Sequence, residues 1–170
     1  MANIDRPQGM WPIGHLTGGE IRTRSYTLTT SATVFKGDPL KVVTGGTVEV
    51  AAADDGLIII GVAAEYVATS AAGATVQVYD DPYIVFGVQA DSGTAVAATA
   101  VFSKANLNTY AAGSTTTGIS IVELDSSDID TGSQLKILGK VERPDNTWAE
   151  HVDLAVVFNE HFWKAAVAAV

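Results

Sequence analysis

An alternation of apolar and other residues with a period of two is the feature that most limits the fold of this chain. From Val152 to Phe158 every second residue is Val, Leu or Phe, which is typical of a strand with one buried face. Other short runs are rich in β-branched residues and lie between turn residues; they span 76–79, 84–88 and 135–141. The sequence therefore predicts an all-β fold of about eight or nine short strands.

Turn residues separate these runs. The Thr-Gly-Gly segment at 44–46 lies between two strand-like runs at 40–43 and 47–50, and Gly-Gly supplies the positive φ angles that a tight hairpin requires. The segment 20–28 is expected to be a further strand with one polar face. The Gly- and Thr-rich segment 113–118 is typical of a loop.

Helix is expected at one place only, from Thr94 to about residue 106. The alanines of this segment favour a helix, and Ser92 or Asp91 could cap its N-terminus. The tail at 162–170 is too short to be stable as an isolated helix.

The length of 170 residues suits one domain that buries its core without metals or disulfides. We expect a β-sandwich or barrel of short antiparallel strands over residues 20–161. An extended N-terminal arm at 1–19 precedes this β domain, and an apolar C-terminal tail at 162–170 follows it.

Both ends of the chain are more apolar than free termini usually are. The arm combines prolines and glycines with several large apolar side chains. Such side chains usually lie in a groove, either on the chain's own domain or on a neighbouring subunit. Two apolar ends favour contact between subunits. The candidate contact residues are Met10, Trp11, Ile13, His15, Phe162 and Trp163.

Composition excludes several classes of protein. Acidic residues outnumber basic ones by 19 to 10, so the chain lacks the positive charge that binding to nucleic acid requires. The absence of cysteine excludes disulfides, thiolate zinc sites and a cysteine nucleophile.

We expect neither a membrane span nor a secretory signal, because the longest apolar run, at 57–64, is only as long as a strand. The segment 51–103 has no Lys or Arg and forms either one side of a polarised surface or a solvated acidic face.

The sequence offers little for catalysis or cofactor binding. In a strand, His151 and Asp153 would point to the same face, but no third metal ligand is identifiable. The segment 125–130 lacks the spacing of a calcium loop and is expected to be a solvated acidic turn. A spatial Ser-His-Asp triad stays open, although the nucleophile-elbow and phosphate-loop motifs are absent. We therefore expect no enzymatic activity, no cofactor and no metal.

Short segments along most of the chain carry a resemblance to a known family. They are 1–9 (MANIDRPQG), 12–22, 35–39 (FKGDP), 79–82 (YDDP), 86–91 (FGVQAD), 113–118 (GSTTTG), 123–125 (ELD), 141–146 (VERPDN) and 158–161 (FNEH). In this order they resemble the capsid cement, or head decoration, proteins of tailed bacteriophages. None of the segments is a chemical signature by itself, and the apolar tail after Phe162 departs from the family pattern.

The resemblance implies a β-rich, non-enzymatic protein that binds the outside of a major capsid protein shell. It implies a homotrimer, with a dimer as the second expectation, and assembly in the cytoplasm of a host bacterium. If the arm carries the contacts, deletion of residues 1–16 should abolish capsid binding and leave the β domain folded.

Two other functions stay open at this stage. One is a low-copy adhesin of the phage tail or fibre that recognises a host glycan or protein. The other is a small hydrolase or lyase acting on polysaccharide, which would need a pair of carboxylates such as Glu123 and Asp125 in a cleft.

Overall fold

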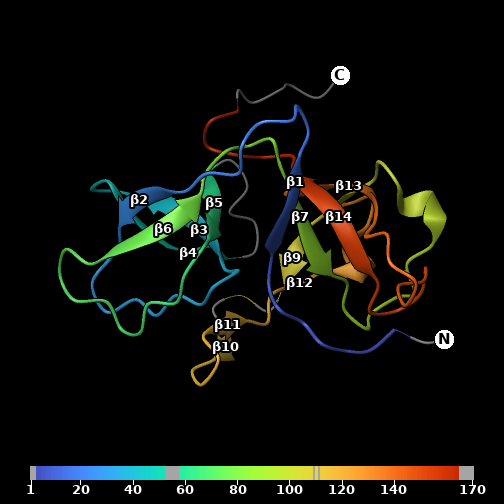
Figure 1. Cartoon of the computed structure of the whole chain (residues 1–170), viewed down its shortest axis with the longest axis horizontal. Coiled ribbons are helices and arrows are strands. Elements are labelled where there is room, and N and C mark those ends of the chain that lie inside the picture. The colour runs from blue at the N-terminus through green and yellow to red at the C-terminus, as the bar shows by residue number, and fades with distance from the viewer. Residues whose placement is uncertain (1–2, 53–57, 109, 111, 165–170) are drawn as a thin grey trace.

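Two five-stranded antiparallel sheets form the fold in the computed structural model, which describes residues 3–52, 58–108, 110 and 112–164 (Figure 1). Sheet 1 has the strand order β1-β7-β14-β13-β8, and sheet 2 has the order β2-β6-β5-β3-β4. The sheets make a sandwich-like arrangement within one small domain, so the predicted all-β fold is confirmed.

The strands are short, as the sequence predicts. Sheet 1 consists of β1 (Trp11–His15), β7 (Ile84–Gln89), β14 (Asp153–Phe158), β13 (Leu135–Lys140) and β8 (Lys104–Ala105). Sheet 2 consists of β2 (Arg24–Thr27), β6 (Thr75–Tyr79), β5 (Ile59–Ala63), β3 (Pro39–Val43) and β4 (Thr47–Val50). Two smaller antiparallel pairs join β9 (Leu107–Asn108) to β12 (Glu123–Leu124) and β10 (Gly113–Ser114) to β11 (Ile119–Ser120).

Two hydrophobic cores stabilise the domain, and β5 contributes to both. Ile59 of β5 packs in the larger core with Phe86 and Phe158, whereas Ile60 packs in the smaller core with Leu40. Successive side chains of a strand point to opposite faces, so one strand can serve two cores. The predicted glycine hairpin is confirmed, because β3 pairs with β4 and Gly45 and Gly46 have φ angles of 100° and 79°.

The predicted helix from Thr94 to about residue 106 is wrong. Within the described residues, helix is confined to two 3-10 turns, η1 (Ala98–Ala100) and η2 (Ser126–Asp128). Residues 104–105 instead pair with β13, and residues 107–108 pair with β12. Pairing that buries Ala105 and Leu107 outweighs the weak helix preference of the alanines.

The segment 113–118 is also more regular than a loop. Its first two residues form β10 and pair with β11, so only residues 115–118 make the connecting turn. Gly118 has a φ of 69°, and a Cβ there would lie 2.8 Å from the Cβ of Tyr66. Glycine is therefore required at this position both by the backbone angle and by the packing.

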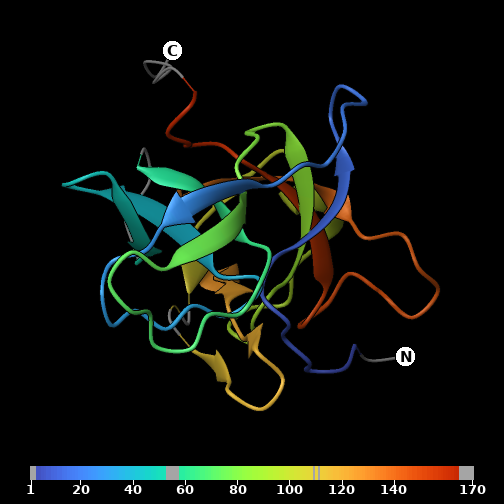
Figure 2. The same ribbon diagram turned by 60° about the vertical axis from the view of Figure 1, so that its left-hand side comes forward.

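The N-terminal arm lies on its own domain, along one side of the molecule (Figure 2). Residues 11–15 are not an unpaired extension but β1, the edge strand of sheet 1, which pairs antiparallel with β7. Gly87 of β7 faces the ring of Trp11, and a Cβ at Gly87 would lie 2.3 Å from Trp11 Cε2. Because Gly87 has no side chain, the indole ring of Trp11 can pack directly against the sheet.

Candidate functional site

The exposed parts of the two chain ends meet at a single turn. The backbone N–H of Leu16 donates to the carbonyl of Tyr83 at 2.9 Å, and His15 Nε2 lies 3.2 Å from Asp81 Oδ2. The turn between β6 and β7 thus holds the chain just after β1. In Figure 1 this turn, the segment after β1 and the C-terminal segment lie together at the top of the molecule.

The C-terminal segment is fixed to the same region. The N–H of Phe162 donates to the carbonyl of Ile59 at 2.7 Å, which attaches the segment to β5. Lys164 Nζ lies 5.5 Å from the centroid of the Tyr83 ring, within the range of a cation–π contact. The rings of Phe162 and Trp163 pack edge to face with centroids 4.9 Å apart.

These contacts gather four large apolar side chains that stay exposed, and we call them the end patch. Their exposed fractions are 51% for Leu16, 47% for Tyr83, 44% for Phe162 and 52% for Trp163. Single exposed apolar residues are ordinary on protein surfaces; here four of them lie on segments that the contacts above join, which makes the end patch the candidate binding surface.

A polar hollow of about 540 Å³ borders the end patch. Tyr83 and Trp163 line it together with charged residues of 20–24 and of the turn at 80–82. Asp80 Oδ2 accepts a hydrogen bond from Tyr26 Oη at 2.6 Å and lies 3.3 Å from Arg24 Nε. Burial and the nearby Asp80 carboxylate raise the pKa of Tyr26, so its hydroxyl remains a donor. The hollow therefore presents aromatic rings beside fixed charged groups.

The predicted contact residues fall into two groups. Phe162 and Trp163 belong to the end patch, and Ile13, 41% exposed, occupies the bulge of β1. Met10 is only 2% exposed and packs in the larger core, so almost none of its surface is accessible to a partner. Its N–H donates to the carbonyl of Gly37 at 2.9 Å.

The side chains of Trp11 and His15 also make their contacts within their own domain. The Trp11 ring lies against Gly87, as described above. The side chain of His15 is 6% exposed, and its Nδ1 accepts hydrogen bonds from the N–H groups of Thr17 and Gly19. His15 therefore organises the turn after β1 and presents almost no surface to a partner.

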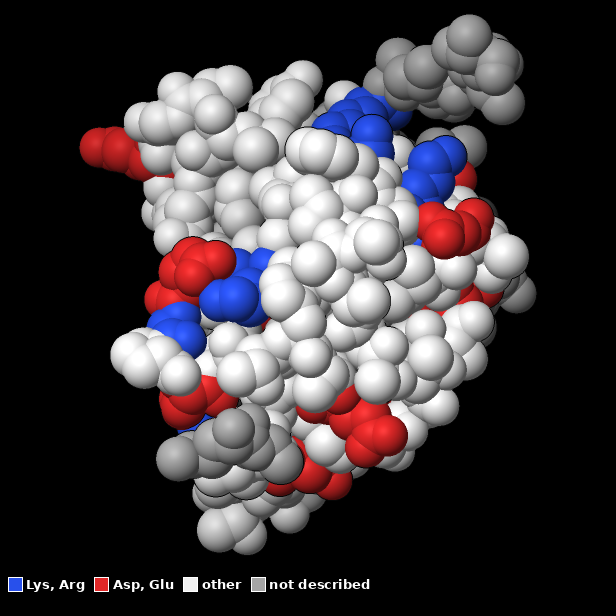
Figure 3. Space-filling view, turned by 90° about the vertical axis from the view of Figure 1, so that its right-hand side faces the viewer, with Lys and Arg blue, Asp and Glu red and all other residues white. Residues whose placement is uncertain are grey.

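The predicted contact set lacks two residues of the end patch, Leu16 and Tyr83, and it also lacks the exposed Phe102. Tyr83 follows the Asp-Asp-Pro turn, and an aromatic residue in a turn was the only available signal. Phe102 is 74% exposed and has a φ of 72°, which is rare for a bulky residue. The helix expected over this segment concealed it. The face that carries η1 has a wide uncharged area bounded by scattered charged groups (Figure 3).

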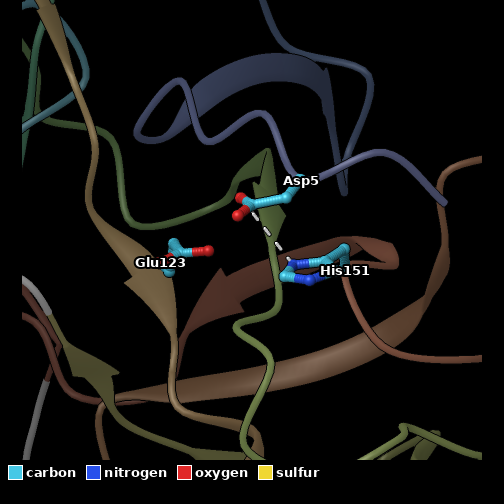
Figure 4. A group of neighbouring side chains, drawn as sticks. All are labelled: Asp5, Glu123 and His151. Carbon is cyan, nitrogen blue, oxygen red and sulfur yellow. Dashed lines mark ion pairs between the residues drawn. The ribbon is translucent and has the colours of Figure 1, made fainter.

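Within the described residues, Asp5, Glu123 and His151 lie close enough to hold a metal ion (Figure 4). Each offers one ligand atom, and these atoms lie within 4.8 Å of one another. The predicted pairing of His151 with Asp153 on one face of a strand is wrong, because His151 has a φ of 55° and β14 begins only at Asp153. Asp153 instead forms an ion pair with Arg143 and accepts a hydrogen bond from Gln89.

The other acidic groups considered from the sequence have structural partners. Asp125 caps η2, since its Oδ1 accepts from the N–H and hydroxyl of Ser127. The two carboxylate oxygens of Asp128 accept from Asn106 and Thr131. The segment 125–130 is thus a turn held by hydrogen bonds both within itself and to Asn106 and Thr131. Asp125 is engaged in this turn, whereas Glu123 points towards Asp5 and His151.

A comparison with profiles of known protein families gives no match, and a search of curated proteins finds none of significant similarity. No helix among the described residues is long and apolar enough to cross a membrane.

Contacts from Gln89, Ser120 and Gly37 hold the arm on the domain. Gln89 accepts from the N–H of Arg6 at 2.7 Å and donates to the carbonyl of Ile4 at 3.1 Å. A Cβ at Gly9 would lie 2.7 Å from the Cβ of Ser120 and 2.9 Å from the carbonyl oxygen of Gly37. These contacts therefore dock residues 4–9 of the arm on the domain.

Proposed function

We propose that this chain is a non-enzymatic cement protein that binds the outside of the major capsid protein shell of a tailed bacteriophage. The observation that carries the proposal is the end patch, where exposed apolar side chains lie on the segments after β1 and after β14 and on the turn at Tyr83. The resemblance along the sequence supplies the identity of the partner. The low content of charged residues, 17%, agrees with a surface partly covered in an assembly.

The physical role follows from mass action. A protein that binds the assembled shell and not its separated subunits stabilises the shell. DNA packed in the head pushes the capsid subunits apart, and a clamp across neighbouring subunits opposes this load. Many copies on one lattice let each contact be weak. Aromatic residues concentrate binding energy in such small contacts, and the end patch holds three of them.

We propose a homotrimer on the virion surface, with the dimer as the alternative, following the same resemblance. Assembly would take place in the cytoplasm of the host bacterium. Mass measurement by light scattering after gel filtration gives the number of chains in the isolated oligomer directly. A mass equal to one chain would refute both states for the free protein.

Co-sedimentation with purified empty capsid shells tests the proposed contact. Wild-type protein should pellet with shells in a saturable manner, and Leu16→Ser or Trp163→Ala should weaken binding by about tenfold or more, the scale expected for residues at the centre of an interface. Each variant should keep the wild-type circular dichroism spectrum and melting temperature, because both side chains are about half exposed.

Ile4→Ser is the matched control, because Ile4 is 73% exposed and lies on the arm, outside the end patch. This variant should bind shells like wild type. Loss of binding in Ile4→Ser with full binding in Leu16→Ser and Trp163→Ala would move the contact to the arm and contradict the proposal for the end patch. Absence of any binding by the folded wild-type chain would contradict the cement function itself.

A low-copy adhesin is the second candidate, and the polar hollow favours it. Tyr83 and Trp163 can stack on sugar rings, while the charged groups of Arg22, Arg24 and Asp80 can bind hydroxyl groups. Copy number separates the two functions: a cement protein follows the number of capsid subunits, whereas an adhesin is present in few copies per virion.

A further inference from the structure

Three side chains from distant parts of the sequence converge at the N-terminal arm (Figure 4). Asp5 comes from the arm, Glu123 from β12 and His151 from the residues that precede β14. We propose that Asp5, Glu123 and His151 bind a divalent transition-metal ion, best matched by Zn²⁺, which ties the arm to the β domain. This inference is independent of the proposed capsid contact.

The distances allow the site to close on an ion with small movements. Ligand atoms about 2.0–2.2 Å from a common ion are about 3.0–3.5 Å from one another. Asp5 Oδ1 and His151 Nδ1 are 3.8 Å apart, and the three ligand atoms lie within 4.8 Å of one another. The side chain of Asp5 is 66% exposed, so it can rotate towards the other two without disturbing the core.

His151 shows one feature that a metal ion would explain. Its Nδ1 is buried and has no hydrogen-bond partner, although nearly all buried polar atoms in proteins have one. Its φ of 55° takes the side chain out of the alternation of β14 and leaves it beside Asp5 and Glu123. The carbonyl of His151 accepts from Gln89 Nε2 at 3.1 Å, which helps to hold this backbone in place.

The local electrostatics also favour a cation. The carboxylates of Asp5 and Glu123 converge here, and Asp91 adds a third carboxylate close by, because its N–H donates to the carbonyl of Leu124, next to Glu123, at 3.0 Å. Asp91 cannot join the site without breaking existing bonds, because its two carboxylate oxygens accept from Gly93, Ser126 and Asn108. It therefore adds negative potential to a place where two other carboxylates converge. A divalent ion bound to Glu123 would neutralise this repulsion.

The donor atoms select the kind of ion. One imidazole nitrogen with two carboxylates suits borderline metals such as Zn²⁺, whereas Ca²⁺ and Mg²⁺ prefer ligand sets made only of oxygen. Three protein ligands leave at least one position for water, as expected for a site at which Asp5 is exposed.

The bound ion would reinforce a set of contacts that already holds the start of the arm. Asn3 Nδ2 donates to the carbonyls of Thr147 and Glu150, both at 2.8 Å. Asn3 Oδ1 in turn accepts from the N–H of Thr147 at 2.9 Å. These bonds lie among residues shortly before His151, so the metal would close a clip between the arm and this part of the chain.

Calorimetric titration of the full chain with Zn²⁺, after treatment with EDTA, tests the site. We expect one ion per chain, and weaker binding by about tenfold or more in His151→Asn and Glu123→Gln, since losses of even outer partners of a metal cost about 10- to 100-fold in affinity. Asparagine is chosen at position 151 because it tolerates a positive φ. Ca²⁺ in place of Zn²⁺ should bind more weakly.

His15→Asn is the matched control, because His15 also lies beside a carboxylate, that of Asp81. This variant should keep wild-type affinity. Hydrogen exchange adds a readout that a surface ion would not change: Zn²⁺ should slow exchange of the amides at residues 4–6 and 8–10 in wild type but not in His151→Asn.

Several results would overturn the proposal. They are the absence of Zn²⁺ binding to the wild-type chain, equal Zn²⁺ affinity of wild type and His151→Asn, or loss of Zn²⁺ binding in His15→Asn alone.

The melting temperature supplies a further check that does not depend on Zn²⁺ affinity. Without metal, Glu123→Gln should melt at or above the wild-type temperature at pH 7, because it removes the charge repulsion. A clearly lower melting temperature would mean that Glu123 has a structural role instead.

Discussion

The residues on the two sides of the bulge in β1 are similar in type but have opposite environments. Met10 is 2% exposed, whereas Leu16, in the same stretch of sequence, is 51% exposed. Between them, β1 pairs with β7 and then bulges at Ile13. Met10, just before β1, is part of the larger core, whereas Leu16, just after β1, reaches the turn at Tyr83.

This contrast separates residues that fold the protein from residues that are available to a partner. The sequence alone gives Met10 and Leu16 the same appearance, because both are large apolar side chains in a segment rich in Gly and Pro. Only the pairing of β1 and the position of Gly37 and Gly87 decide which of them is buried. The variants below test this division.

Deletion of residues 1–16 should have the largest effect. It removes the edge strand of sheet 1 and the buried Met10, and it uncovers the surface beneath Trp11. We expect a loss comparable to the whole stability of a domain, about 5 kcal/mol or more, so the truncated chain should be largely unfolded by circular dichroism. This corrects the expectation from the sequence that the β domain would stay folded. A truncated chain with the wild-type urea midpoint would show that the arm is dispensable for folding.

Met10→Ala and Leu16→Ala form a matched pair. Removal of the buried Met10 side chain should cost about 2–5 kcal/mol, because it leaves a cavity in the larger core. Leu16→Ala should change stability by less than about 0.5 kcal/mol. Urea unfolding of both variants measures the difference. Equal midpoints would contradict the division between the two regions.

Acid should weaken the support beneath the end patch. His161 is fully buried, accepts from the N–H of Trp163 at 3.2 Å, and packs against Phe158. Burial, followed by the nearby charge of Lys164, lowers the pKa of His161 to about 4. The unfolded chain takes up a proton near pH 6.5, whereas the folded chain stays neutral until about pH 4.

The contribution of neutral His161 to stability is therefore complete above pH 6.5 and is lost as the pH falls towards 4, by up to about 3 kcal/mol. Asp38 acts in the opposite direction, because burial raises its pKa to about 6 and protonation then favours the folded state. Urea unfolding of wild type and His161→Gln at several pH values isolates the histidine. The wild type should lose more stability than the variant between pH 6.5 and 4, and parallel curves would refute this role.

Trp163→Ala should have the smallest effect on stability, below about 0.5 kcal/mol, because its side chain is 52% exposed. The same variant should lose binding to capsid shells. Stability and binding would then be separable at the end patch, unlike at Met10. A large drop in the urea midpoint would show that Trp163 belongs to the folding core instead.

The sequence predicts the strands well and the sites poorly. Period-two segments and the turn at 44–46 depend on local chemistry, and these are confirmed as β3, β4, β7 and β13. The helix at 94–106 fails because pairing with distant strands outweighs its local preference.

The site residues depend on contacts between distant segments, which a single sequence does not contain. Tyr83 joins the two ends of the chain through a backbone hydrogen bond and a ring contact, and neither leaves a pattern in the sequence. In the same way, His151 meets Asp5 and Glu123 rather than its neighbour Asp153, because its positive φ breaks the alternation assumed for a strand.

Quantitative mass spectrometry of purified virions, from the phage that encodes this chain, tests the central claim most directly. It measures the molar ratio of the chain to the major capsid protein. The cement function predicts a ratio close to a simple fraction of one, with hundreds of copies per particle. A handful of copies would instead favour an adhesin of the tail or fibre, and complete absence from virions would contradict both functions.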